Sequence, residues 1–303
     1  MPQREGESMS GFSAGWLELR EGFDVAAREA ALSAFDLPML ARRGRDGQGL
    51  LHVLDLGCGS GANLRALAPM LGPGQRWQLA DHDPLLLAAV PGALAAWAAP
   101  RGIACAPLAD AIRLVGPDWD AELRLQCIDL ARSLDSLDLS AFALIGASAL
   151  LDLVSAPWLD VLLRRARDAG SSLLFGLSVD GRLDWLPAVH GDAEVARLFA
   201  AHQARDKGFG PALGAAAVPH AAGRLRALGY QVHQAASDWW IDGAGAAPAR
   251  SMLHALIDGA GAAAIEQAPG ERAFVEAWTV QRLNRVEATR LRVGHLDLLA
   301  TLP

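Results

Sequence analysis

The sequence is poor in the residues that mark secreted, nucleic-acid-binding and membrane-spanning proteins. Its 303 residues include three cysteines, Cys58, Cys105 and Cys127, which cannot form an even disulfide framework. The formal net charge is −7 and there is no basic run, which argues against a nucleic-acid partner because phosphate binding needs clustered Lys or Arg. The apolar stretch 85–99 is interrupted by Pro91 and is too short to span a bilayer, and the N-terminus has no apolar signal core. We therefore expect a reduced, cytoplasmic protein that does not work in a membrane.

The stretch 53–63, VLDLGCGSGAN, combines a buried strand, a glycine loop and the start of a helix. Apolar residues surround Asp55, as in strands that are covered on both faces. Gly57, Gly59 and Gly61 let the backbone turn tightly and lie against a ligand with no Cβ in the way. This arrangement predicts a nucleotide-type cofactor site.

Two kinds of cofactor fit such a loop. Gly57, Gly59 and Ala62 satisfy the loose dinucleotide fingerprint, and Asp81 lies 20 residues past the last glycine, near the place of a ribose-binding acid. Asp55 weighs against a dinucleotide, because a carboxylate two residues before the first glycine would repel a pyrophosphate. It suits a ligand that carries an ammonium group and no phosphate.

The stretch resembles motif I of the class I S-adenosylmethionine-dependent methyltransferases, which has the form hydrophobic-x-Asp-x-Gly-x-Gly-x-Gly. The resemblance covers roughly residues 50–180, with strand ends in the right order, and continues weakly to the end of the chain. It implies an α/β fold with a doubly wound, seven-stranded, mostly parallel sheet whose last strand is antiparallel, plus an N-terminal helix and helical insertions. It also implies S-adenosylmethionine as cofactor and S-adenosylhomocysteine as product.

The resemblance also assigns roles to residues. In the family, the acid that ends the second strand takes both ribose hydroxyls, and Asp81 matches it. An acid near the end of the third strand lies by the adenine amino group, where Asp129 stands, and the segment from Ser148 passes under the methionine portion. Asp55, Asp81 and Asp129 could each merely cap a turn or a helix, but their occurrence at successive strand ends favours a ligand site. The cofactor-binding residues expected in this way are Asp55, Gly57, Cys58, Gly59, Gly61, Asn63, Asp81, His82, Asp129, Leu130, Ser148 and Arg20.

The chain divides into four expected parts. An N-terminal helical cap (1–48) precedes a cofactor-binding Rossmann-like core (49–178) and a lid over the substrate (179–215). The C-terminal part of the core (216–303) carries a helical insertion at about 242–288 between the last two strands. This insertion departs from the close hairpin that is common in the family, and it could form a pocket wall or a homodimer surface.

Apolar residues at three- and four-residue steps from Trp16 to Ala27 predict an amphipathic helix before the first strand. If this helix lies over the cofactor cleft, Arg20 or Arg28 could pair with the methionine carboxylate, for which a guanidinium fork is well shaped. An exposed pair between Asp24 and Arg28 within the helix is the alternative.

We expect the fifth strand at residues 172–177, and the segment after it is unusually polar and aromatic for this alanine-rich chain. Its pattern predicts a helix over 194–207 that places His202 and Asp206 on one face. A simple pairing of these two side chains on a solvated helix is the alternative to a substrate site. No metal is expected, because the spacing of His190, His202 and Asp206 matches no recognised ligand pattern. The expected substrate-binding residues are His202, Gln203, Asp206, Lys207 and Trp185.

Two features near the end of the chain have open readings. Trp239 and Trp240 could stack on a planar substrate, although such residues are more often core. His295 and Asp297 share one face of a predicted strand and could point into the cleft or close the edge of the sheet.

These observations predict a methyltransferase that acts on a small-molecule acceptor at oxygen, nitrogen or carbon by in-line displacement. The protein would supply proximity and desolvation, and a base only if the nucleophile must lose a proton. His202 and His295 are the candidate bases. The alternatives are an NAD(P)-dependent Rossmann oxidoreductase and a non-catalytic S-adenosylmethionine-binding protein.

Overall fold

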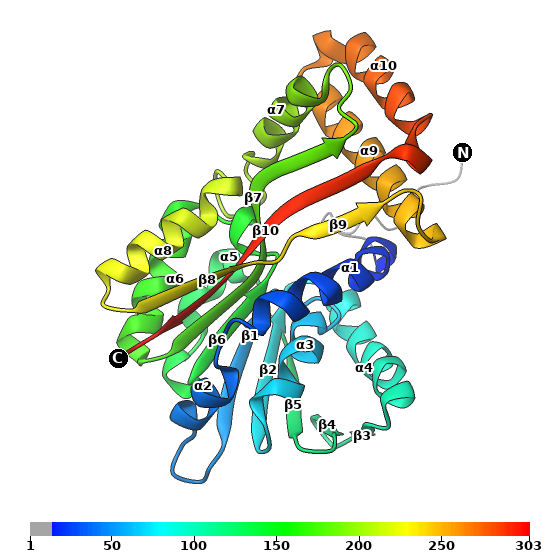
Figure 1. Cartoon of the computed structure of the whole chain (residues 1–303). Helices are drawn as coiled ribbons and strands as arrows, with labels where there is room; N and C mark the ends of the chain where they lie inside the picture. Colours follow the sequence, from blue (N-terminus) through cyan, green and yellow to red (C-terminus); the bar gives the residue numbers. More distant parts are fainter. Residues whose placement is uncertain (1–13) are drawn as a thin grey trace, which may run out of the picture.

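The fold is built on one ten-stranded sheet with helices on both faces (Figure 1). This computed structural model describes residues 14–303. The strands lie in the order β3-β4-β5-β2-β1-β6-β7-β10-β8, and β9 pairs with β10 beside this path. The strands are β1 (Leu51–Leu56), β2 (Gln75–Asp81), β3 (Ala104–Pro107), β4 (Ile112–Val115), β5 (Asp120–Cys127), β6 (Leu144–Ser148), β7 (Ser172–Leu186), β8 (Gln231–Ala236), β9 (Trp239–Asp242) and β10 (Arg290–Thr301).

The centre of the sheet has the topology expected from the sequence. β5, β2, β1, β6 and β7 run parallel, and β10 runs antiparallel between β7 and β8. The expected count of seven strands was wrong, because three further strands lie outside this centre. β3 and β4 form an antiparallel hairpin that extends the sheet beyond β5, and β9 pairs with β10. Each has only four residues, which is too short to give a recognisable hydrophobic period.

The helices cover the sheet in two layers. α2, α3 and α4 pack on one face, and α6 and α8 pack on the other (Figure 1). None of the helices within residues 14–303 combines the length and the apolar character needed to cross a membrane. The helices are α1 (Ala14–Leu32), α2 (Leu37–Gly44), α3 (Ala62–Leu71), α4 (Pro84–Ala98), α5 (Leu130–Ser133), α6 (Ala156–Ala169), α7 (Asp192–Gln203), α8 (Ala217–Ala227), α9 (Ala247–Gln267) and α10 (Arg272–Leu283).

The side chains of β1 alternate between these two layers. Leu54 and Leu56 belong to the core that α6 and α8 cover, whereas Leu51 and Val53 belong to the core that α2, α3 and α4 cover. Because successive side chains of a strand point to opposite faces, Asp55 lies on the face of Leu51 and Val53. The strand period therefore directs this carboxylate toward α3.

β7 and β10 extend beyond the rest of the sheet. The sequence predicted a strand only at 172–177, but the ladder between the two strands continues to the pair Leu186 and Arg290. With β9, this extension packs against α7, α9 and α10 in the upper part of Figure 1. The core formed there includes Trp185, Trp239 and Trp278.

The helix expected over 194–207 ends before Asp206. The Asp206 carboxylate instead accepts hydrogen bonds from the backbone N–H groups of Gly208 at 2.7 Å and Gly210 at 2.9 Å, which closes a polar loop. His202 and Asp206 therefore do not share a helix face, and that expectation was wrong. The reason is that a short polar side chain offers the following backbone an alternative to helix.

Candidate cofactor and active site

A cavity of about 370 Å³ lies at the carboxyl ends of β1, β2, β5 and β6. This is where open α/β sheets bind their ligands. α1 closes one side of it, and the loop after α7 closes another. Its lining consists of Leu17, Arg20, Gly57, Gly59, Asp81, His82, Leu86, Asp129, Leu130, Ala131, Arg132, Ser148, Ala149, Leu150, Leu153, Lys207, Gly208 and Phe209.

The glycine loop after β1 forms the floor of this cavity. Gly57 and Gly59 have φ values of 64° and 52°, which lie in the left-handed region that L side chains rarely adopt. A Cβ on Gly59 would lie 3.8 Å from the side chain of Leu17 in α1, and one on Gly57 would lie 3.5 Å from Leu150. Gly61 is different, because a Cβ there would meet Val90 of α4 instead. The loop therefore presents bare backbone to a ligand at Gly57 and Gly59, whereas Gly61 packs against α4.

Asp81 holds this loop in place from the end of β2. Its Oδ2 accepts a hydrogen bond from the Gly59 N–H at 2.8 Å, and its Oδ1 accepts one from the Asp83 N–H at 3.0 Å. The side chain is 6 % exposed, and it belongs to the cavity lining. Each carboxylate oxygen has a further lone pair, so Asp81 can also accept hydrogen bonds from a vicinal diol in the cavity.

The end of β5 supplies the next wall. Asp129 caps α5 by accepting a hydrogen bond from the Ala131 N–H at 3.0 Å, and it lies in the lining together with Leu130. The structure thus brings Asp81, His82 and Asp129 to the wall of one cavity. Asp129 both caps α5 and lines the cavity, so its role as a helix cap does not exclude a role in ligand binding.

Asp55 lies behind the loop in a buried polar network. It is fully buried, and its Oδ1 accepts a hydrogen bond from Asn63 Nδ2 at 2.6 Å. Arg28 of α1 donates to Asn63 Oδ1, and its Nε lies 3.5 Å from Asp297 Oδ2 of β10. Burial raises the pKa of Asp55 to about 7, although the hydrogen bond from Asn63 and the charge of Arg28 act in the opposite direction.

Several atoms of this network have no hydrogen-bond partner among residues 14–303. They are Asp55 Oδ2, Asp297 Oδ2, and Nε and Nη2 of Arg28. Arg28 Nε and Asp297 Oδ2 form the 3.5 Å ion pair described above, which leaves Asp55 Oδ2 and Arg28 Nη2 without a partner of either kind. Buried donors and acceptors are normally satisfied, so these two atoms indicate a place for a polar ligand group or water. Arg28 also lines a neighbouring cavity of about 460 Å³ between α1 and α3, which shares Ser148 with the first cavity.

Two residues with left-handed backbone lie beside this network, and no motif in the sequence marks them. Ala149 after β6 has φ 52°, and Leu177 in β7 has φ 53°. The Ala149 N–H donates to Gly176 O at 2.9 Å, and the Leu177 N–H donates to Asp297 Oδ1 at 2.8 Å. Such strained residues persist where the surroundings hold them, and they gather at functional sites.

Arg20 is the cation that α1 presents to the cavity. Its Nε and Nη2 donate to the Asp24 carboxylate at 2.8 and 3.1 Å, and its guanidinium lies 5.0 Å from the centre of the Trp239 ring. Trp239 Nε1 also donates to Asp24, at 3.0 Å. Arg20 is only 8 % exposed, so the guanidinium is held in one orientation at the cavity wall.

The residues expected to bind substrate are dispersed. Lys207 lines the cavity, whereas His202 lies 3.3 Å from Glu266 of α9 through its Nε2. Trp185 is buried against Trp278, with ring centroids 6.1 Å apart. Neither Gln203, which ends α7, nor Asp206 is part of the lining.

His295 is buried beside Trp239, with ring centroids 4.8 Å apart. Its Nδ1 lies 3.1 Å from Val293 O, and the residue is not part of the cavity lining. Burial first, and then the charge of Arg20, lower the pKa of His295 to about 4. A histidine with this pKa is neutral at pH 7 and has little affinity for a proton.

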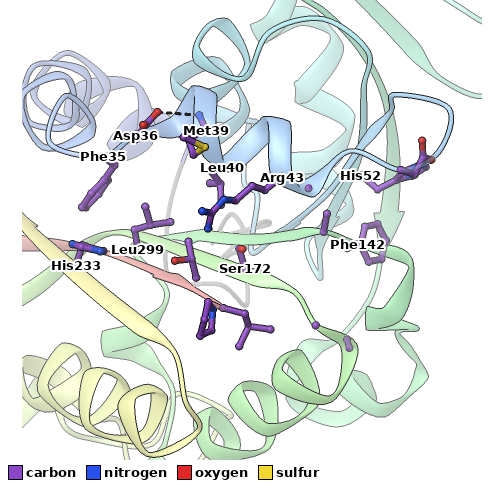
Figure 2. A pocket seen from close by; sticks show the side chains of 18 of the residues that line it. Phe35, Asp36, Met39, Leu40, Arg43, His52, Phe142, Ser172, His233 and Leu299 are labelled. Carbon is purple, nitrogen blue, oxygen red and sulfur yellow. Dashed lines mark hydrogen bonds and ion pairs between the residues drawn. The ribbon is translucent and has the colours of Figure 1, made fainter.

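A larger hollow, of about 850 Å³, lies at the opposite end of the sheet (Figure 2). His52, Phe142 and Ser172 line it near the starts of β1, β6 and β7, and Arg43 of α2 points into it (Figure 2). It has no glycine loop and no carboxylates at strand ends. Because ligands of open α/β sheets bind outside the carboxyl ends of the strands, we assign the cofactor site to the smaller cavity. Within residues 14–303, no group of three or more His, Cys, Asp or Glu side chains is arranged to hold a metal ion.

No protein-family profile and no curated protein sequence matches this chain. The fold does have solved counterparts. A cyclopropane-fatty-acyl-phospholipid synthase-like protein from Lactobacillus casei has 12 % sequence identity and a TM-score of 0.50, and the match covers 96 % of this chain and 94 % of that one. An arsenic(III) S-adenosylmethionine methyltransferase from Chlamydomonas reinhardtii has 17 % identity and a TM-score of 0.39, over 92 % of this chain and 73 % of that one.

A phosphoethanolamine N-methyltransferase from Haemonchus contortus, solved with S-adenosylhomocysteine, has 9 % identity and a TM-score of 0.42, over 98 % of this chain and 61 % of that one. At these identities a structural likeness shows the fold alone, and of these three proteins the one from Lactobacillus casei, with a TM-score of 0.50, supports that statement. That match extends over nearly the whole of both chains. The chain therefore shares the α/β fold of that protein, and its mostly parallel central sheet with helices on both faces is consistent with a Rossmann-like methyltransferase fold.

Proposed function

We propose that this protein is an S-adenosylmethionine-dependent methyltransferase that acts on a small-molecule acceptor. The observation that carries the proposal is the pair of carboxylates around the glycine loop. Asp81 lies in the cavity wall beside Gly59, and Asp55 is buried behind the loop with Oδ2 unpaired. A cationic, phosphate-free ligand with a ribose fits this arrangement, because carboxylates attract an ammonium group and accept hydrogen bonds from hydroxyls.

The residues present fit S-adenosylmethionine at each part of the cavity. Asp81 would hold the ribose hydroxyls, and Asp129 with Leu130 would border the adenine. The bare backbone of Gly57 and Gly59 would lie under the methionine portion.

The amino-acid end of the cofactor would meet the buried network. Asp55 Oδ2 would receive the ammonium group directly or through a water molecule, and Arg20 or Arg28 would pair with the carboxylate. Nη2 of Arg28 has no hydrogen-bond partner among residues 14–303, and the guanidinium of Arg20 is held in one orientation by Asp24; both observations support this division of roles. Cys58 and Asn63 would act by shaping the loop, since neither lines the cavity.

When bound, S-adenosylmethionine supplies an activated methyl group whose leaving group is the neutral thioether. The protein's contribution is then alignment and the exclusion of water. Leu17, Leu150, Leu153 and Phe209 give the cavity an apolar wall that suits both tasks.

We further propose that the segment 179–215 acts as the lid over the acceptor through its loop 206–211, which brings Lys207 to the cavity. The insertion with α9 and α10 supports this lid, because His202 and Arg205 both contact Glu266 of α9. The protein would work in the cytoplasm, and the outer face of the insertion would be the surface for a homodimer.

The NAD(P)-dependent oxidoreductase is the weaker alternative, because a pyrophosphate over the glycine loop would face the carboxylate of Asp55. A non-catalytic binding protein would need no acceptor space, yet Leu153, Lys207 and Phe209 line the cavity in addition to the residues assigned to the cofactor.

Isothermal titration calorimetry with S-adenosylmethionine, S-adenosylhomocysteine and NADH tests the cofactor. We expect the first two to bind and NADH not to bind; binding of NADH alone would refute the proposal. Methyl transfer from labelled S-adenosylmethionine to a pool of small metabolites then tests for catalysis. Tight binding of S-adenosylhomocysteine without any transfer would favour the non-catalytic alternative.

A further inference from the structure

Lys207 is the single lysine of the sequence, and it lies in the wall of the cofactor cavity. It makes no hydrogen bond and no ion pair with another residue of the range 14–303. The two arginines of the lining differ from it, because each has a carboxylate partner. Arg20 is bound to Asp24, and Nε of Arg132 lies 3.6 Å from Asp129 Oδ2. The charge of Lys207 is therefore available to a ligand in the cavity.

The loop 206–211 holds Lys207 at this place through its own contacts. Asp206, the acid next to Lys207 in the chain, already accepts the two backbone hydrogen bonds that close the loop, and it pairs with Pro211 in a β-bridge. The ring of Phe209 packs edge-on against Trp158 of α6, with ring centroids 5.1 Å apart. The loop is thus a built structure that is fixed to the start of α6, and Lys207 lies within it.

The rest of the lining provides apolar surface around this lysine. Among the lining residues that are not expected to bind the cofactor, the ionisable ones are Arg132 and Lys207, and the others are apolar residues and one glycine. No carboxylate belongs to this remaining part of the lining. An acceptor with an ammonium group would meet positive charge there and no counter-ion, whereas a carboxylate or a phosphate would meet Lys207.

The cofactor itself gives Lys207 no separate partner. S-adenosylmethionine carries one anionic group, its carboxylate, and the proposed function places that group at Arg20 or Arg28. The ribose and the adenine are uncharged. A second anionic group in the cavity would therefore belong to the acceptor.

We propose that the methyl acceptor is an anion, with a carboxylate or a phosphate on an apolar body. Lys207 binds the anionic group through a charge-assisted hydrogen bond, and Leu153 and Phe209 contact the apolar body. The inference rests on the proposed methyltransferase function and adds the class of its substrate. It makes Lys207 a residue that determines specificity, since the chain as a whole is acidic, with a net charge of −7, and would otherwise repel an anion.

The test uses labelled S-adenosylmethionine and a pool of small metabolites that ion exchange at pH 7 has separated into anionic, neutral and cationic fractions. We expect the wild type to methylate the anionic fraction. Lys207→Met removes the charge and keeps the length of the side chain, so it should methylate that fraction about tenfold to a hundredfold more slowly. Lys207→Arg should stay within about threefold of the wild type, because a guanidinium also donates charge-assisted hydrogen bonds to carboxylates and phosphates.

Arg197→Met is the matched control. It removes a cation from the same segment, but the Arg197 side chain is 64 % exposed and lies outside the lining. This variant should methylate the anionic fraction as the wild type does. All three variants should bind S-adenosylhomocysteine within about threefold of the wild type, since none of the changes removes a contact with the cofactor.

Three outcomes of this test would contradict the proposals. Label that enters mainly the neutral or the cationic fraction, or equal rates for Lys207→Met and the wild type, would overturn the inference and leave the proposed function intact. A large loss of S-adenosylhomocysteine affinity in Lys207→Met would assign the lysine to the cofactor and also overturn the inference. Failure of the wild type to bind S-adenosylhomocysteine would instead overturn the proposed function.

Calorimetry decides the question even if no fraction accepts the label. Protein loaded with S-adenosylhomocysteine is titrated with benzoate, phenyl phosphate, benzyl alcohol and benzylamine, which are small aromatic compounds of different charge. We expect at least one of the two anions to bind, which also distinguishes a carboxylate from a phosphate, and Lys207→Met should bind it at least about tenfold more weakly. Binding of benzyl alcohol or benzylamine alone, or no binding of either anion, would overturn the inference.

Discussion

Replacing Asp55 by asparagine isolates the charge of the buried network while keeping the shape of the side chain. In the wild type, Oδ1 is bonded to Asn63 and Oδ2 has no partner, and the residue is fully buried. The amide oxygen of the variant can still accept the hydrogen bond from Asn63. What changes is the cost of holding an ionised group in this place.

The magnitude follows from the pKa of Asp55, which burial moves from the ordinary 3.8 to about 7. A shift of this size means that folding disfavours the ionised form of Asp55, relative to the protonated form, by on the order of 4 kcal/mol. Between pH 4 and pH 7 the folded protein keeps a proton that the unfolded chain has lost, so stability falls as the pH rises through this range. We therefore expect Asp55→Asn to gain stability relative to the wild type between pH 5 and pH 8, by about 1 kcal/mol or more.

Ligand affinity should change in the opposite direction. An ammonium group paired with ionised Asp55 contributes on the order of 1.5–3 kcal/mol, so Asp55→Asn should bind S-adenosylhomocysteine about tenfold to a hundredfold more weakly at pH 8. Below pH 7 the wild type must first lose the proton, so its affinity should fall by up to about fivefold between pH 7 and pH 6. Adenosine lacks the ammonium group and should bind both proteins equally at every pH.

Urea unfolding and calorimetry of both proteins at several pH values provide the measurements. A stability difference that does not vary between pH 5 and pH 8 would show that Asp55 does not titrate there. Equal losses for S-adenosylhomocysteine and adenosine would show that Asp55 only shapes the loop. Either result would refute the reasoning.

Three further predictions follow from the same geometry. Asp81→Ala should weaken S-adenosylhomocysteine and adenosine alike, by on the order of 2–3 kcal/mol or about a hundredfold in calorimetry, because both ligands carry the ribose; unchanged binding would contradict the assignment. Lys207→Ala should lower the rate of methyl transfer while keeping the affinity for S-adenosylhomocysteine within about threefold, because Lys207 lines the cavity. His202→Ala should change the rate and the affinity by less than about twofold, because His202 contacts α9. A large loss only in the histidine variant would show that His202, and not Lys207, lies at the acceptor site. Gly176→Ala should lower the free energy of unfolding in urea by about 1–3 kcal/mol, because its Cβ would lie 2.9 Å from Cζ of the buried Arg28; a neutral effect would mean that Arg28 can move aside.

The centre of the fold could be predicted from the sequence because its signals are local. The apolar run around Asp55 and the glycines that follow it specify a strand, a turn and a helix within about twenty residues. Alternation along that strand also places Asp55 on the face of Leu51 and Val53. The convergence of Asp81 and Asp129 on one cavity follows from the rule that parallel strands end at the same edge.

The extent of the strands could not be read in the same way. β7 continues for nine residues beyond the predicted end because β10, more than a hundred residues later, supplies the hydrogen bonds of the ladder. The end of α7 likewise depends on where the Asp206 carboxylate finds donors, and it finds them in Gly208 and Gly210. Sequence periodicity carries neither piece of information.

Some residues of the site could be predicted from the sequence, and others could be found only in the structure. Glycines and carboxylates at strand ends were visible in the sequence because a motif joins them, whereas the partners of Arg28 come from α3 and β10. Local backbone preference and the strand period determined the cofactor loop, while desolvation and charges brought together from distant segments decided which side chains can act beside it.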